Sequence, residues 1–286
     1  MGVSQLRARV RPQIVDGLFY PAEREPLVDL VETLMSRSPT PRGSCFAVIS
    51  PHAGYTYAGA VMASAFRAVS LKPVRRAVLI GPMHRDPIDG FFLPESAAFS
   101  TSLGDAPVDE DAVQALASSD PSFTRDDIPH LEEHCLEVQL PFLLNLFPGV
   151  SIVPILVGSS GPAAAATLAR ALRLTFQKAA EYTLFVVSAN MASYMTGKDP
   201  ETESRTLEKL IEVRDWRGIL AASERRAISS CGATAIAALI SMAGDDCRVE
   251  ILARADSRES EQPSDQDRAP QEDRIVRYAS VGFSAK

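Results

Sequence analysis

Short runs of apolar residues alternate with segments of helical periodicity along most of this chain. Nearly continuous apolar, β-branched runs are typical of strands whose two faces are both covered by other elements. Such runs predict strands at 45–50, 76–81, 150–158 and 183–188. Two further strands, paired near an edge of the sheet, are expected at 247–255 and 274–283.

Helical patterns occupy the intervals between these runs, and Pro162 suits the first turn of one of them. Helices are predicted at 24–36, 58–70, 162–180, 204–213 and 232–242. Strands that alternate with helices indicate an α/β fold, here a three-layer sandwich with a mostly parallel central sheet. No repeat or linker interrupts the pattern, so we expect a single domain over residues 1–286. The polar segment 257–273 is expected to form a mobile loop.

The composition is that of an ordinary globular protein. Of the 286 residues, 46% are hydrophobic and 23% are charged, and this length supports a large core without disulfides. The formal charge is -7 and the basic residues form no block, so neither nucleic acid nor a membrane surface is an expected partner. We see no signal-peptide pattern, and the longest apolar helical stretch, 231–244, is shorter than the roughly 20 residues that cross a bilayer. The four cysteines form no CxxC pair, so reduced thiols and a cytoplasmic location are expected.

Histidines follow two of the predicted strands. His52 comes just after the run at 45–50, and His84 comes just after the run at 76–81. In open α/β sheets, ligands bind just beyond the carboxyl ends of the strands. A lone histidine at such a place is often a hydrogen-bonded loop residue. Two at matching positions are also candidate metal ligands, because imidazole is the commonest metal ligand in proteins.

Cys231 is a third candidate ligand. It follows two serines and opens an apolar helical stretch, which predicts a serine N-cap and a thiol in the first helical turn. The positive end of the helix dipole lowers the pKa of such a thiol and favours the thiolate, the form that binds metals. The alternative is a buried cysteine that packs as a small hydrophobe, which is how we interpret Cys45, Cys135 and Cys247.

The other two histidines, His130 and His134, are four residues apart. That spacing puts both on one face of a helix, provided that the helix begins early enough. The pattern is not HExxH, so it does not predict a zincin site. His134 lies beside Glu133 and is a candidate for acid/base chemistry or for orienting a metal ligand. A cluster of polar residues at a helix start is the structural alternative.

Together, several motifs resemble the MEMO family, the AmmeMemoRadiSam system protein B type, whose fold is related to the class III extradiol dioxygenases. The matching stretches are PHAGYTYAG at 51–59, GPMH at 81–84, EHCLEVQLPFL at 133–143 and CG at 231–232. The segments VRP at 10–12 and YASVGF at 278–283 are also similar. The resemblance therefore covers nearly the whole chain.

The resemblance implies an extradiol-dioxygenase-like fold and a metal held by His52, His84 and Cys231. Two imidazoles and one thiolate leave coordination positions open, as in reactive metal sites. The set parallels the two-histidine, one-carboxylate triad of non-haem iron, with sulfur in place of oxygen. We expect Fe(II) ahead of Cu(I) or zinc.

One departure from the family pattern changes the expected chemistry. The family usually reads SSDxxH at the third strand end, where this chain reads SANMAS at 188–193, so Asn190 replaces the Asp and Ser193 the His. In the related dioxygenases that histidine is the acid/base near the metal, a task that serine cannot perform unaided. Glu133 and His134 are therefore the remaining catalytic candidates, and standard ring cleavage is not expected. The candidate substrate-binding residues are Tyr55, Asn190, Ser193 and Tyr194.

Three functions remain open from the sequence. The first is a metal-binding protein with redox or oxygenase-like activity and a degenerate active site. The second is a non-catalytic module that binds a small molecule or peptide in the same pocket and works with a radical SAM or AMMECR-type partner. The third is nucleophilic chemistry at Cys231, with His52 or His84 as the base.

Overall fold

The computed structural model describes residues 9–39, 44–85, 88–193, 199–258 and 275–286. In this part of the chain, eight strands form the main sheet: β2 (Cys45–Ser50), β3 (Arg76–Pro82), β4 (Phe91–Leu93), β7 (Phe123–Arg125), β8 (Ser151–Val157), β9 (Thr183–Ser188), β10 (Cys247–Asp256) and β11 (Arg277–Ala285). Their order in space is β10-β11-β2-β9-β3-β8-β4-β7. A separate small sheet joins β1 (Val10–Arg11), β5 (Ala98–Phe99) and β6 (Ala106–Pro107).

The main sheet is mixed rather than uniformly parallel. Its central strands β2, β9, β3 and β8 run parallel to one another. Toward one edge, β11 is antiparallel to both β2 and β10, and toward the other, β4 is antiparallel to β8. The predicted α/β fold with a large central sheet is confirmed. The parallel order that was predicted for most of the sheet is found in its centre and in the edge pair β4–β7, whereas β10–β11, β11–β2 and β8–β4 are antiparallel.

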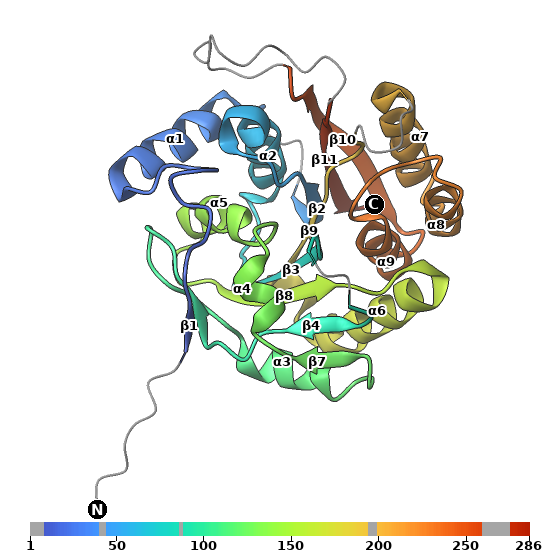
Figure 1. Cartoon of the computed structure of the whole chain (residues 1–286), viewed down its shortest axis with the longest axis horizontal. Helices are drawn as coiled ribbons and strands as arrows, with labels where there is room; N and C mark the ends of the chain where they lie inside the picture. The colour runs from blue at the N-terminus through green and yellow to red at the C-terminus, as the bar shows by residue number, and fades with distance from the viewer. Residues whose placement is uncertain (1–8, 40–43, 86–87, 194–198, 259–274) are drawn as a thin grey trace, which may run out of the picture.

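Helices cover both faces of this sheet (Figure 1). One face packs against α1 (Arg24–Arg37), α2 (Tyr55–Val69) and α5 (Leu140–Leu146). The other shares its core with α3 (Glu110–Ala117), α6 (Gly161–Phe176), α7 (Pro200–Glu212), α8 (Trp216–Glu224) and α9 (Ala233–Ala243). The remaining described helices are α4 (Ile128–Glu132), η1 (Glu137–Gln139) and η2 (Gln177–Tyr182).

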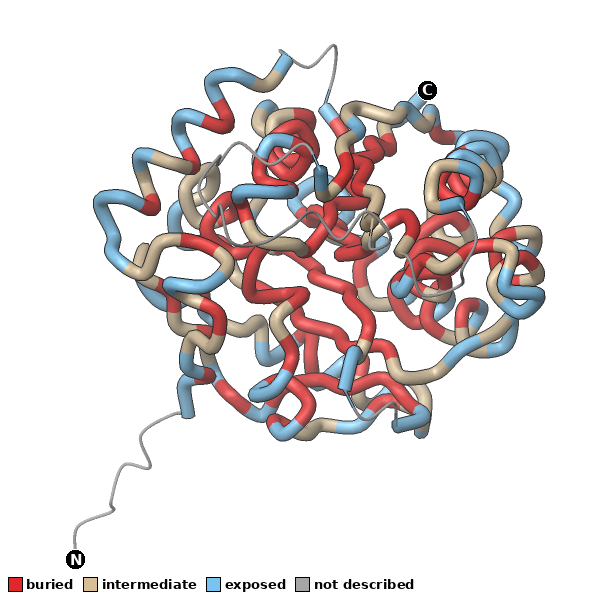
Figure 2. The backbone as a smooth tube through the Cα atoms, turned by 45° about the horizontal axis from the view of Figure 1, so that its top comes forward, coloured by how far each residue is buried: buried red, intermediate tan, exposed pale blue. Residues whose placement is uncertain are grey.

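The strands are apolar on both faces because each face supplies one of two hydrophobic cores. In β3, Val78 and Ile80 belong to the core under α6 and α9, whereas Ala77 and Leu79 belong to the core under α2 and α5. Side chains of successive strand residues point to opposite faces, which produces this alternation. Figure 2 shows buried strands at the centre and exposed residues on the outer surfaces of the helices.

The parallel centre of the sheet determines where candidate functional residues can meet. Because β2, β9 and β3 are neighbours with one direction, the segments that follow them emerge at the same edge of the sheet. Residues 259–274, which make up most of the expected loop 257–273, lie outside the described residues.

Candidate metal centre

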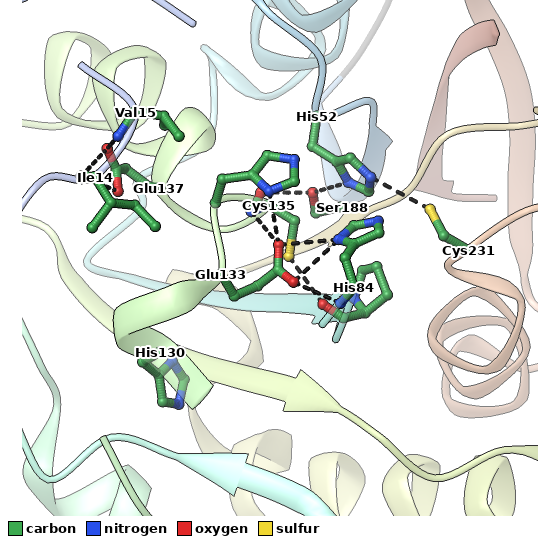
Figure 3. A network of polar contacts seen from close by, with 12 residues as sticks. Ile14, Val15, His52, His84, His130, Glu133, Cys135, Glu137, Ser188 and Cys231 are labelled. Carbon is green, nitrogen blue, oxygen red and sulfur yellow. Dashed lines mark hydrogen bonds and ion pairs between the residues drawn. The ribbon is translucent and has the colours of Figure 1, made fainter. Parts of the chain in front are cut away.

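His52, His84 and Cys231 come together at the carboxyl edge of the central strands (Figure 3). One ligand atom from each of these residues lies within 4.8 Å of the others. The Nε2 atom of His52 is 3.4 Å from the Cys231 sulfur, and the two imidazole centroids are 4.9 Å apart. His52 is buried, whereas His84 and Cys231 are exposed at the rim.

Ser188, the last residue of β9, fixes the orientation of the His52 ring. Its hydroxyl donates to the carbonyl oxygen of Cys135 at 2.8 Å, so the oxygen can only accept from His52 Nδ1, which is also 2.8 Å away. The side-chain amide of Gln139 donates to the same hydroxyl oxygen at 3.2 Å. The Nδ1 proton of His52 is therefore directed to Ser188, and Nε2 is the ring atom that faces Cys231.

Glu133 orients the second imidazole in the same way. Its two carboxylate oxygens lie 3.1 Å from Nδ1 of His84, and one of them also accepts the His84 backbone N–H at 2.8 Å. An ionised carboxylate is only an acceptor, so Nδ1 of His84 donates and Nε2 is available for a metal ion. Burial opposes ionisation of Glu133, but hydrogen bonds from His134 and His84 outweigh it and hold the pKa of this carboxyl well below its usual range.

Without an ion, Cys231 and His84 form a charged pair. Desolvation opposes ionisation of the thiol, but the charge of His52 and hydrogen bonds with both imidazoles lower the pKa of Cys231 to about 5. Desolvation also opposes protonation of His84, and hydrogen bonds with Cys231 and Glu133 raise the pKa of this imidazole to about 10. A bound cation would replace the proton that His84 holds. The donor set, with two oriented imidazoles and a thiolate, thus fits a transition-metal ion.

The turn that carries Cys231 differs from the sequence prediction. Helix α9 begins at Ala233 with Gly232 as its N-cap, so the thiol lies before the helix rather than in its first turn. Ser230 does not cap the helix, because its hydroxyl donates to the backbone carbonyl of Asn190 at 2.6 Å. A Cβ atom on Gly232 would lie only 2.4 Å from Cβ of Ala189, so this turn can approach β9 only with glycine there.

His130 and His134 do not share a helical face. Helix α4 ends at Glu132 and Glu133 is extended, so the chain turns between the two histidines. His130 is buried and lies 3.1 Å from the Phe92 carbonyl through Nε2, and burial lowers its pKa to about 4. His134 instead lies at the site: its Nδ1 is 3.1 Å from Glu133, and its ring stacks on His84 at 5.2 Å.

The remaining predicted site residues have diverse surroundings. Tyr55 is buried and its hydroxyl donates to the Val138 carbonyl at 2.7 Å, so this side chain is engaged in packing rather than offered to a ligand. The side-chain oxygen of Asn190 accepts the His52 backbone N–H at 3.2 Å. Ser193 donates its backbone N–H to the hydroxyl of Ser229 at 2.9 Å. Tyr194 lies outside the described residues.

Ser188 and Gln139 orient the site, but neither was assigned this role from the sequence. Besides its contact with Ser188, the amide of Gln139 donates to the Pro51 carbonyl at 2.8 Å and so fixes the residue before His52. The available signal was the glutamine within the largely apolar stretch EVQLPFL at 137–143, since an amide that is buried there needs partners.

Glu137 has no contact with the candidate metal ligands. Its carboxylate pairs with the fully buried guanidinium of Arg11 and accepts the Tyr20 hydroxyl at 2.7 Å. The backbone N–H groups of Ile14 and Val15 also donate to it at 3.1 Å (Figure 3). This carboxylate therefore anchors the N-terminal segment to the interior.

The sequence comparisons identify the family. A family model described as Memo-like protein matches residues 11–270. The chain belongs to this family. A MEMO1 family protein of Thermotoga neapolitana is 31% identical over 253 residues, which cover 84% of this chain and 91% of the relative. One from Aeropyrum pernix is 33% identical over 81% of this chain and 87% of the relative, and one from Thermoplasma acidophilum is 30% identical over 80% and 85%.

A solved structure of an uncharacterized protein from Escherichia coli K12 can be superimposed on this Memo-like chain. The superposition covers 82% of this chain and 98% of the solved one. Its TM-score of 0.47 and 14% identity are too low to decide the fold relationship. Within the described ranges, no helix has both the length and the apolar character that a membrane span requires.

Proposed function

We propose that this Memo-like protein binds one transition-metal ion, Fe(II) ahead of Cu(I) or zinc, through Nε2 of His52, Nε2 of His84 and the Cys231 sulfur. The observation that carries the proposal is the orientation of both imidazoles. Ser188 and Glu133 each accept from an Nδ1–H, so the Nε2 atom of each ring is the one left for a metal ion that the Cys231 sulfur also binds. Such partners are typical of histidines that ligate metals.

We further propose a redox or oxygenase-like activity, for which a bound iron would supply open coordination positions. Glu133 keeps the His84 ring in place, and the His134 ring stacks on His84 at a centroid distance of 5.2 Å. Because Nδ1 of His134 is engaged with Glu133, its Nε2 is the atom that would take or give a proton. Ser193 offers no titrating group, so a ring cleavage that needs the family histidine is not expected. The kinship with class III extradiol dioxygenases is part of this proposal.

A second function is favoured by the contacts of the segment that follows β9. Ser193 is engaged through its backbone with Ser229, and Asn190 accepts from His52 and Ser230. These contacts suit a structural role, and residues 189–193, the described part of this strand end, include no acid/base side chain. The same pocket would then bind a small molecule or peptide without catalysis, beside a radical SAM or AMMECR-type partner.

Elemental analysis of iron-supplemented protein, purified without oxygen, tests the metal proposal. We expect about one ion per chain in the wild type and little in His52→Ala, because two ligands hold a metal weakly. His130→Gln is the matched control, since His130 is buried away from the ligands and glutamine keeps a donor for the Phe92 carbonyl. Protein that retains no metal under these conditions would exclude the proposal.

Two further measurements separate the alternatives. Oxygen consumption by the iron-loaded protein supports the redox function, and capture of a radical SAM or AMMECR-type protein without oxygen consumption supports the binding module. Rapid alkylation of Cys231 in the metal-loaded protein would support the nucleophilic function, whereas protection of Cys231 by metal contradicts it.

A further inference from the structure

Asn190 contacts the loop that carries His52 and the turn that carries Cys231. Its side-chain oxygen accepts the backbone N–H of His52 at 3.2 Å, and its backbone carbonyl accepts the Ser230 hydroxyl at 2.6 Å. The donor at His52 is a backbone N–H, so the side-chain atom that faces it must be the amide oxygen. The residue thus bridges the loop after β2 and the turn before α9.

We propose that Asn190 is a positioning residue that ties the His52 loop to the Cys231 turn and thereby sets the distance between His52 Nε2 and the Cys231 sulfur. This inference deepens the proposed function and rests on it. It assigns a structural task to the strand end whose acid/base histidine is replaced by Ser193.

Other contacts of the same strand end show that the Cys231 turn is docked on it from both sides. Before Cys231, the hydroxyl of Ser229 accepts the Ser193 N–H at 2.9 Å and lies 3.0 Å from the Ser193 carbonyl oxygen. After Cys231, Gly232 packs against Ala189 so closely that a side chain would not fit. The position of the sulfur therefore depends on where this segment lies.

The Ser229 contact is in turn supported from α7. The buried carboxylate of Glu203 is a hydrogen-bond partner of the Ser229 hydroxyl. On the other side, the Asn190 amide oxygen joins this segment to the backbone N–H of His52. Loss of its amide oxygen would therefore leave the His52 N–H without this acceptor, while the contacts of Ser229 with Ser193 and of Gln139 with Pro51 stay in place.

Two substitutions separate the acceptor from the rest of the side chain. Asn190→Asp keeps an oxygen that can accept the His52 N–H, whereas Asn190→Ala removes it. The sequence contains one other asparagine, Asn145 in α5, so Asn145→Ala is the matched control. Thermal unfolding of each variant establishes that it is folded before any comparison is made.

The first measurement uses metal-free protein. Amide hydrogen exchange of His52, followed by NMR, should be about ten-fold faster in Asn190→Ala, because a lost hydrogen bond raises the local opening. Asn190→Asp and Asn145→Ala should retain the wild-type rate. An unchanged His52 rate in Asn190→Ala overturns the inference, whatever the protein does with metals.

The second measurement uses Co(II) as a probe of the ligand geometry. Asn190→Ala should bind Co(II) about 10–100-fold more weakly, with a weaker thiolate-to-cobalt absorption band, and Asn190→Asp should restore both. Wild-type affinity and spectrum in Asn190→Ala would overturn the inference. Wild-type protein that binds no Co(II) would contradict the proposed function, and the exchange experiment would then decide the link between Asn190 and His52 by itself.

Discussion

Two buried glutamates four residues apart, Glu133 and Glu137, serve different regions of the molecule. Glu133 faces the metal-centre region, where it accepts from the imidazoles of His84 and His134. Glu137 faces the N-terminal region, where it accepts from Arg11, Tyr20 and two backbone N–H groups. The partners differ in kind, since an imidazole can exchange its proton for a metal ion near neutral pH and a guanidinium cannot.

The same division separates His130 from His134. The backbone carbonyls of His130 and Glu133 accept hydrogen bonds from the Arg11 guanidinium, both at 2.8 Å. Arg11 of the N-terminal segment therefore holds the backbone of this turn. The His130 ring stays in the interior, while the His134 ring reaches the metal-centre region. The segment 130–137 thus anchors the N-terminal segment with one set of side chains and orients the candidate site with another.

The largest effect is expected from Glu137→Gln. This change leaves the Arg11 guanidinium buried without its counter-charge, which costs about 3–5 kcal/mol of unfolding free energy. Urea unfolding measures it, with the exposed Glu132→Gln as control. A loss of metal affinity without a loss of stability would contradict the assignment of Glu137 to the N-terminal region.

Glu133→Gln should act mainly on the site. A partner that orients a metal-ligating histidine contributes about 10–100-fold in metal affinity, or about 1.4–2.7 kcal/mol. Competitive titration with a metal chelator measures the change, and the neighbouring Glu132→Gln should bind like the wild type. Equal metal affinities for Glu133→Gln and Glu132→Gln would contradict the assignment of Glu133 to the candidate site and would remove its distinction from Glu137.

A smaller effect is expected from the pH dependence of His130. Burial lowers its pKa to about 4 from an ordinary 6.5, so the unfolded chain takes up the proton first as the pH falls. Stability is therefore present above pH 6.5 and is lost toward pH 4, by about 1 kcal/mol between about pH 7 and about pH 5.5. In His130→Gln the decline over this range should be shallower by that amount, and an identical decline would show that His130 does not titrate in this way.

The sequence predicted the long elements of the fold because their patterns are strong. The continuous apolar runs became β2, β3, β8 and β9, and the Ala-rich segment with Pro162 became α6. Short elements such as β4 and α4 were not predicted, because three to five residues carry little periodicity. The break after Glu132 therefore could not be predicted, and the sequence left open whether a helix began early enough to put His130 and His134 on one face.

The candidate ligands could be proposed from strand ends and family motifs, but their orienting partners could not. Glu133 meets His84 across 49 positions in the chain, and Ser188 meets His52 across 136. No local pattern encodes a contact of that separation. Likewise, the serine before Cys231 was predicted to be an N-cap. Its hydroxyl instead donates to the backbone carbonyl of Asn190, a contact that only the tertiary structure creates.

X-ray absorption at the iron edge of the loaded protein tests the central claim most directly. The account predicts one sulfur scatterer together with imidazole scatterers in the wild type, and no sulfur scatterer in Cys231→Ser. The control Cys247→Ser changes a buried cysteine in β10 and should retain the wild-type spectrum. An iron shell of oxygen and nitrogen alone in the wild type would contradict it.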